Sequence, residues 1–145
     1  MSVHLSVAGR SDVGRSRTNN EDALIVADLA GVAWLRGPMP QGRFEVARSG
    51  VLLAVSDGMG GEKAGEVASA MVVDALARHV AGGPPAAPAD RLLKEGVELA
   101  HREVFEAAHR AAWRGMGATL TALLVQNRGS LATALIAEVL SLIHI

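Results

Sequence analysis

Two acidic segments, each beside an apolar run of strand length, are the residues of this chain best suited to chemistry. Asp57 and Gly58 follow the apolar run Val51–Val55, and Glu21 and Asp22 precede a second such run. We expect the strand to end at Asp57 and a turn almost free of side chains to follow, which lets backbone carbonyls approach a ligand closely. Hard divalent cations bind oxygen donors at about 2.0–2.6 Å. The two segments can share a cation only if their strands are neighbours, and we predict a metal site where they meet.

Each acidic group also has a simpler interpretation. Asp57 could be a turn residue that bonds neighbouring amides, and Glu21 and Asp22 could form a solvated strand entrance. Their joint occurrence favours the cation site, because three carboxylates at one sheet end repel one another unless a cation relieves the repulsion.

Arg17 lies on the loop before these acids and could bind a phosphate. Its fork of donors holds a phosphate bidentately, which a lysine does less well. Arg10 and Arg15 compete for this role. The alternative is that Arg17 is a surface residue paired with a loop acid.

Composition and motif details disfavour several other functions. The chain has no cysteine, which excludes disulfides and thiolate metal sites. Its 14 basic and 15 acidic residues are mixed, so no basic stripe suggests nucleic acid. A dinucleotide fingerprint needs a third glycine where Lys63 stands, and no Gly-Lys-Ser/Thr sequence follows. We interpret the five histidines as structural or surface residues.

The sequence favours a cytoplasmic protein that does not bind a membrane. No basic segment followed by a long apolar stretch opens the chain. The apolar segment 131–145 is too short, and too interrupted by polar residues, to cross a bilayer of about 30 Å.

Hydrophobic periodicity predicts an α+β domain. Residues 9–20 are polar and contain glycine, and we expect a loop there. Residues 29–50 contain two prolines and four glycines and are expected to be an extended hairpin connection or a mobile surface loop. A helix is expected from Glu62 until the glycines and prolines at 82–85, and a second helix from its cap at Asp90 to Ala111. The expected strands cover 3–7, 23–27, 51–55, 118–125 and a segment beginning near Leu131. Clustered strands around a helix pair favour α+β layers, with the helices over one face.

Several segments taken together resemble the metal-dependent protein serine/threonine phosphatases (the PPM or type 2C family), especially the bacterial branch. The resemblance covers residues 11 to about 125 in the family's order, and linked motifs at proper spacing are a stronger signal than any one alone. The matching segments are 11–23 (SDVGRSRTNNEDA), 53–61 (LAVSDGMGG), 64–69 (AGEVAS) and 116–120 (MGATL).

The resemblance implies an antiparallel β-sandwich flanked by helices, in α-β-β-α layers, with two Mn²⁺ or Mg²⁺ ions at one end. Asp57 would bridge both ions, the Gly58 carbonyl and Glu21 would bind metal, and Asp22 would orient metal-bound waters. Arg17 would bind the substrate phosphate. The implied reaction is direct hydrolysis of phosphoserine or phosphothreonine by a metal-activated water. The implied partners are phosphorylated proteins, either kinases or their substrates.

Some family members carry histidine at the position of Met59, where it is proposed to protonate the leaving group. Methionine cannot do so, and water or another group would have to serve.

The sequence departs from the family after Thr133. A Gly-Asp-Ser-Arg motif is expected there, and segment 134–145 replaces it. Two further metal-binding aspartates of the family lie downstream, and Asp74 and Asp90, on a helix and its cap, cannot substitute. We interpret residues 1–145 as the N-terminal half of one phosphatase domain with a tail at 134–145, an incomplete metal site and unpaired strand edges. This leaves open whether the chain is active, is a non-catalytic phosphoprotein-binding or partner-binding module of the same ancestry, or is a structural domain with surface acids.

Overall fold

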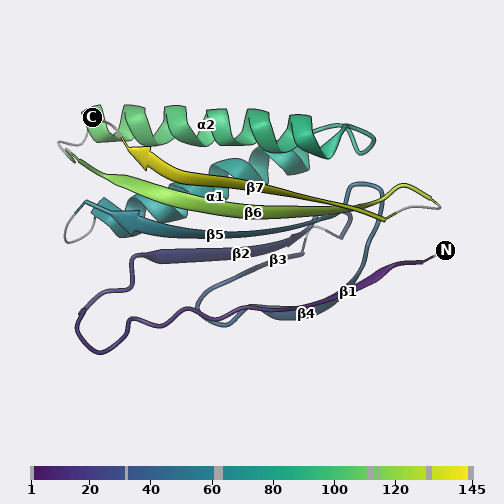
Figure 1. Ribbon diagram of the computed structural model, residues 1–145, viewed down its shortest axis with the longest axis horizontal. Helices are drawn as coiled ribbons and strands as arrows, with labels where there is room; N and C mark the ends of the chain where they lie inside the picture. Colours follow the sequence, from purple (N-terminus) through teal and green to yellow (C-terminus); the bar gives the residue numbers. More distant parts are fainter. Residues whose placement is uncertain are drawn as a thin grey trace.

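The fold is formed by seven strands and two long helices in the part of the chain that the structure describes (Figure 1). The computed structural model describes residues 2–31, 33–60, 64–110, 113, 115–129 and 132–143. The elements are β1 (His4–Ala8), β2 (Asp22–Asp28), β3 (Ala33–Arg36), β4 (Gln41–Glu45), β5 (Val51–Met59), α1 (Ala64–Gly82), α2 (Ala89–Arg110), β6 (Gly117–Asn127) and β7 (Ala132–Ile143).

The elements form three layers. A five-stranded antiparallel sheet in the order β3-β2-β5-β6-β7 lies in the middle, and β1 pairs with β4 in a separate two-stranded antiparallel sheet. Both helices cover one face of the large sheet, and the small sheet lies on the other side (Figure 1). The predicted α+β class and the helix pair over one face are therefore confirmed.

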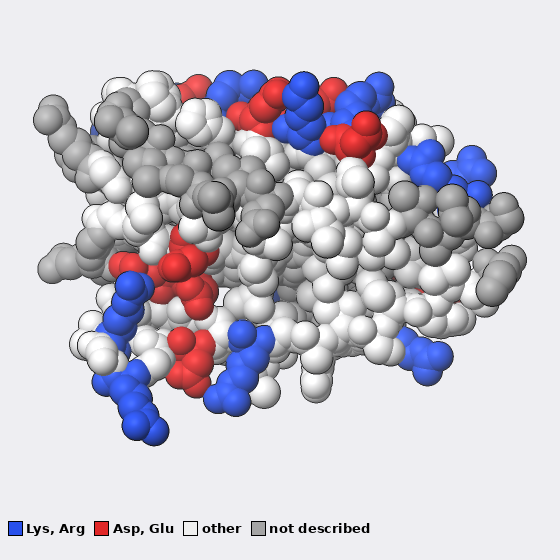
Figure 2. All heavy atoms as spheres, in the orientation of Figure 1, with Lys and Arg blue, Asp and Glu red and all other residues white. Residues whose placement is uncertain are grey.

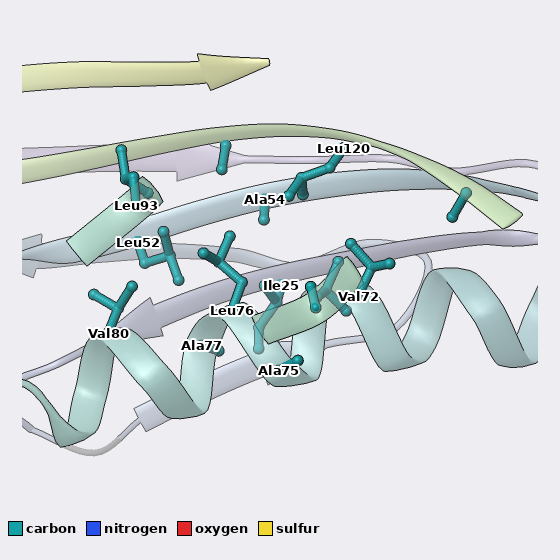
Figure 3. Packing of buried hydrophobic residues seen from close by; sticks show 14 of the residues in the cluster. Ile25, Leu52, Ala54, Val72, Ala75, Leu76, Ala77, Val80, Leu93 and Leu120 are labelled. Atoms are coloured by element: carbon teal, nitrogen blue, oxygen red, sulfur yellow. The ribbon is translucent and has the colours of Figure 1, made fainter. Parts of the chain in front are cut away.

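Small aliphatic side chains fill the space between the helices and the large sheet. Leu52 and Ala54 of β5 face Val72 and Leu76 of α1, and Leu93 of α2 closes the same cluster (Figure 3). These side chains are almost fully buried. Because a strand alternates its faces, Leu52 and Ala54 join this core while Val51 of the same strand faces the other side.

The opposite face of the large sheet is covered only in part. Near the start of β5, Val51 and Val26 pack with Val46 in a second buried cluster, against which the small sheet lies. Farther along the same face, Val55 is 48% exposed and Ile136 is 68% exposed.

Two expectations from the sequence are wrong. The segment 29–50 is not a loop throughout, because it contains β3 and β4. In β4 only alternate residues such as Phe44 are half-buried. The strand has too few apolar residues to give a recognisable strand pattern among the neighbouring glycines and prolines. Asp57 and Gly58 do not belong to a turn: β5 continues to Met59, since β2 and β6 pair with it on both sides.

The remaining predicted elements are confirmed within a few residues, and β6 extends beyond the predicted 118–125. The segment from Ala134, where the sequence departs from the family pattern, belongs to β7 and pairs with β6. Some residues named in the sequence analysis lie outside the described ones: Gly61, Glu62, Lys63, Ala111, Leu131 and His144.

No helix of the described residues is long and apolar enough to cross a membrane. The cytoplasmic location stays a prediction.

The start of α1 touches β5 backbone to backbone. A Cβ added at Gly58 would lie 1.9 Å from the Gly65 carbonyl oxygen, and one added at Gly65 would lie 2.9 Å from Glu21 Cδ. Neither position has room for a side chain, so two glycines set the distance between α1 and the sheet.

We expect Gly58→Ala to lower the free energy of unfolding by about 1–3 kcal/mol, because the methyl group must push α1 away from β5. Gly82→Ala is the control, since a Cβ there meets nothing within 4 Å. Urea unfolding followed by circular dichroism measures both. Equal stability of the two variants would contradict the close approach.

Candidate metal centre

The two acidic segments meet at one end of the large sheet. β2 and β5 are antiparallel, and their register places Asp22 directly opposite Asp57. The backbone N–H of Gly58 donates to the Glu21 carbonyl oxygen at 3.0 Å, which extends the pairing by one residue. The prediction that the two strands are neighbours is confirmed. Acidic side chains gather at this end, on the left of Figure 2, with basic ones beside them.

Glu21 is held between the first turn of α1 and the loop before β2. Its Cδ lies so close to Gly65 that a Cβ added to this glycine would be 2.9 Å from it. Its side chain is 15% exposed, and its Oε2 lies 3.2 Å from Arg17 Nη1. The carboxylate is therefore fixed on one side by the helix backbone and on another by a guanidinium.

Asp57 is positioned through β6. Its backbone N–H donates to Thr119 Oγ1 at 3.1 Å, and the hydroxyl of Ser56 donates to the Thr119 carbonyl at 2.6 Å. These bonds lie between the strand pairs Val55–Thr121 and Gly58–Ala118. Side chains thus help to join β5 and β6 at the position where Asp57 emerges.

Asp22 belongs to a small hydrogen-bond network with the preceding loop. Ser11 Oγ donates to Asp22 Oδ2 at 2.6 Å and accepts from Asn20 Nδ2 at 2.8 Å. Asn20 Oδ1 in turn accepts from the Asp22 backbone N–H at 3.1 Å. The network holds both ends of the loop 11–20 together.

A turn at Asp12 shapes the same loop. The Gly14 backbone N–H donates to the Asp12 carboxylate, and Gly14 has a φ of 75°. This hydrogen bond and then the nearby Arg10 hold the pKa of Asp12 below its ordinary value. The carboxylate thus stays charged and keeps the turn closed.

The loop, β5 and β6 enclose an open depression of about 770 Å³. The described residues that line it are Ser16, Arg17, Thr18, Asn19, Glu21, Asp57, Gly58, Met59, Gly60 and Thr119.

Four of the five predicted site residues line this depression: Arg17, Glu21, Asp57 and Gly58. Asp22 does not, and lines a smaller adjoining cavity of about 220 Å³ together with Asp57.

The oxygen donors that line the depression are of the kind that a hard divalent cation binds, and they supply part of its coordination shell. Two carboxylates and a backbone carbonyl are oxygen ligands of the kind that Mg²⁺ and Mn²⁺ prefer. Among the described residues, no three side chains of His, Cys, Asp or Glu gather closely enough to hold a metal. Water and groups beyond Glu21, Asp57 and Gly58 would have to complete the coordination.

The described histidines take no part in the depression. His79 lies 3.3 Å from Glu95 between the two helices, and His101 and His109 flank Phe105 on α2. Asp74, which the sequence excluded as a ligand, forms an ion pair with Arg36.

Two polar residues near the site were not assigned a role from the sequence. Thr119 contacts Asp57 across 62 positions of the chain, a separation that leaves no local pattern in the sequence. Ser11 contacts Asp22 across 11 positions. The signal for both is their place inside the matching segments 116–120 and 11–23.

The chain resembles known phosphatases in sequence and in structure. It is 37% identical over 123 residues to the serine/threonine protein phosphatase PstP of Mycobacterium tuberculosis, in two strains. That match covers 83% of this chain and 19% of the relative, so the chain spans about a fifth of the length of these curated relatives.

Two solved structures share the fold. The crystal structure of M. tuberculosis PstP matches with a TM-score of 0.57 at 28% identity, over 93% of this chain and 54% of that chain. The S. agalactiae serine/threonine phosphatase matches with the same TM-score at 19% identity, over 93% and 55%, and at that identity supports the fold alone. The fold observed here is thus part of a longer phosphatase fold.

The family profile named Protein phosphatase 2C matches residues 41–139, which include Asp57 and Gly58 and exclude the loop with Arg17. That span is more than half of the 145 residues. The chain belongs to the protein phosphatase 2C family.

Proposed function

We propose that this chain is the N-terminal part of a metal-dependent protein serine/threonine phosphatase and carries part of its metal site. The observation that supports this most directly is the single depression lined by Glu21, Asp57, Gly58 and Arg17. It combines oxygen donors for a divalent cation with a guanidinium suited to a phosphate, which are the two requirements of phosphate ester hydrolysis.

Each residue has a distinct role in the proposal. Asp57, Glu21 and the Gly58 carbonyl would be this chain's ligands for two Mn²⁺ or Mg²⁺ ions. When bound, such ions polarise the phosphoryl group and lower the pKa of a water. Asp22, which Ser11 holds in place, accepts hydrogen bonds from water in the site and orients it. Arg17 binds the equatorial oxygens of the substrate phosphate and offsets their charge.

The proposed substrates are proteins phosphorylated on serine or threonine, either kinases or proteins that kinases modify. The names of the similar proteins support this substrate class. Met59 ends β5 and lines the depression. Because a thioether carries no proton, the leaving oxygen takes its proton from water in this proposal.

A second candidate is a non-catalytic module that binds phosphoproteins or another partner. The observation in its favour is that the described residues offer only a partial ligand set. Such a module would retain cation and phosphate binding and lack turnover.

Calorimetric titration with Mn²⁺ tests the metal site. We expect the wild-type chain to bind and Asp57→Asn to lose at least about tenfold in affinity, as substitutions at metal sites commonly do. Asp28→Asn is the matched control. Asp28 is at the opposite end of β2, and an asparagine there can still accept the hydrogen bond that the Ala30 backbone N–H donates. Identical titrations of all three proteins would mean that these acids are surface groups.

Hydrolysis of p-nitrophenyl phosphate separates the two candidates. We expect turnover to require Mn²⁺ and to disappear in Asp57→Asn, because the reaction depends on the cation that Asp57 holds. Binding of Mn²⁺ without any turnover would favour the non-catalytic module instead.

A further inference from the structure

One cationic side chain lies among the oxygen donors of the depression. Of the described residues that line it, Arg17 alone is positively charged at neutral pH. Arg17 forms its ion pair with Glu21, the acid that the proposed function assigns to the cation. The Arg17 side chain is 65% exposed and that of Glu21 is 15% exposed. The arginine is therefore the exposed partner, whereas the acid packs beside Gly65.

Asp57, the other acid of the depression, differs from Glu21 in the partners of its carboxylate. Among the described residues, no side chain forms an ion pair or hydrogen bond with the Asp57 carboxylate, and only its backbone is bonded, to Thr119. Within the described part of the chain, the Asp57 carboxylate therefore has no positive partner that competes with a cation, whereas Glu21 presents an oxygen that already has one. A carboxylate oxygen that accepts from a guanidinium is a poorer ligand for a second positive charge.

We infer that Arg17 pairs with Glu21 in place of the cation when no cation is bound, and that cation binding releases Arg17 to bind the phosphate. The inference rests on the proposed function and adds an order of binding to it. The cation displaces the guanidinium from Glu21, and the freed guanidinium then becomes a phosphate-binding group. Since such coupling is reciprocal, a phosphate that engages Arg17 also strengthens cation binding.

The competition is expected to be modest in size. An exposed arginine–carboxylate pair contributes about 0.2–1 kcal/mol. Removing the guanidinium should therefore tighten Mn²⁺ binding by about 1.4- to fivefold. Loss of a positive charge near a cation site also tightens binding through space, so the test needs a variant that removes charge without removing a competitor.

Arg15 supplies that control, because it lies on the same loop, is exposed and forms no ion pair among the described residues. Calorimetric Mn²⁺ titration of the full chain compares wild type, Arg17→Ala and Arg15→Ala. We expect Arg17→Ala to bind Mn²⁺ more tightly than Arg15→Ala by about 1.4- to fivefold. Equal affinities in the two variants would overturn the inference alone. Absence of Mn²⁺ binding in all three would overturn the proposed function and the inference with it.

A second readout follows the guanidinium itself. The Nε–H resonance of Arg17, identified by its absence in Arg17→Ala, should shift when Mg²⁺ is added to the wild-type chain. In Glu21→Gln the ion pair is absent beforehand, so the same resonance should respond far less. If Mg²⁺ binds and the Arg17 resonance does not move in the wild-type chain, the guanidinium is not displaced and the inference is wrong.

Discussion

The antiparallel register between β2 and β5 is the constraint on which the site depends. It places Asp22 opposite Asp57 and brings the Glu21 carbonyl to the Gly58 N–H. A slip of one residue would turn the side chains of one strand to the opposite face and separate the acids. The register is itself fixed by the core, because Ile25 and Ala54 pair across the two strands and both are buried beneath α1. Packing of small aliphatic residues therefore determines where the oxygen donors lie.

Much of this architecture could be predicted because its elements are strongly periodic. The helices carry apolar residues at spacings of three and four, and the two central strands are unbroken apolar runs. β3 and β4 could not be predicted, since they are short and depend on partners elsewhere in the chain. β4 pairs with β1, whose residue His4 lies opposite Glu45, and such long-range pairing leaves no local pattern.

The acids of the site were predictable because each lies beside a strong strand signal, whereas their supporting contacts were not. The bond between Asp57 and Thr119 exists only because β5 and β6 are adjacent. For Arg17 the sequence offers two interpretations, a phosphate-binding residue or a surface arginine paired with a loop acid. The structure contains the second arrangement, and the acid in question is Glu21. If a cation displaces Arg17 from Glu21 as proposed, the two interpretations describe successive states of one residue.

The contact between Gly58 and Gly65 has a consequence for how this sequence can vary. A methyl group added at Gly58 cannot be accommodated by trimming a neighbouring side chain, because the obstacle there is the carbonyl of Gly65, and one added at Gly65 meets the Gly58 backbone as well as the Glu21 side chain. Compensation would require the whole of α1 to shift, and the core residues beneath it would have to change together. Laboratory evolution of this domain should therefore leave these two positions untouched while the outer surface of α2 diversifies freely.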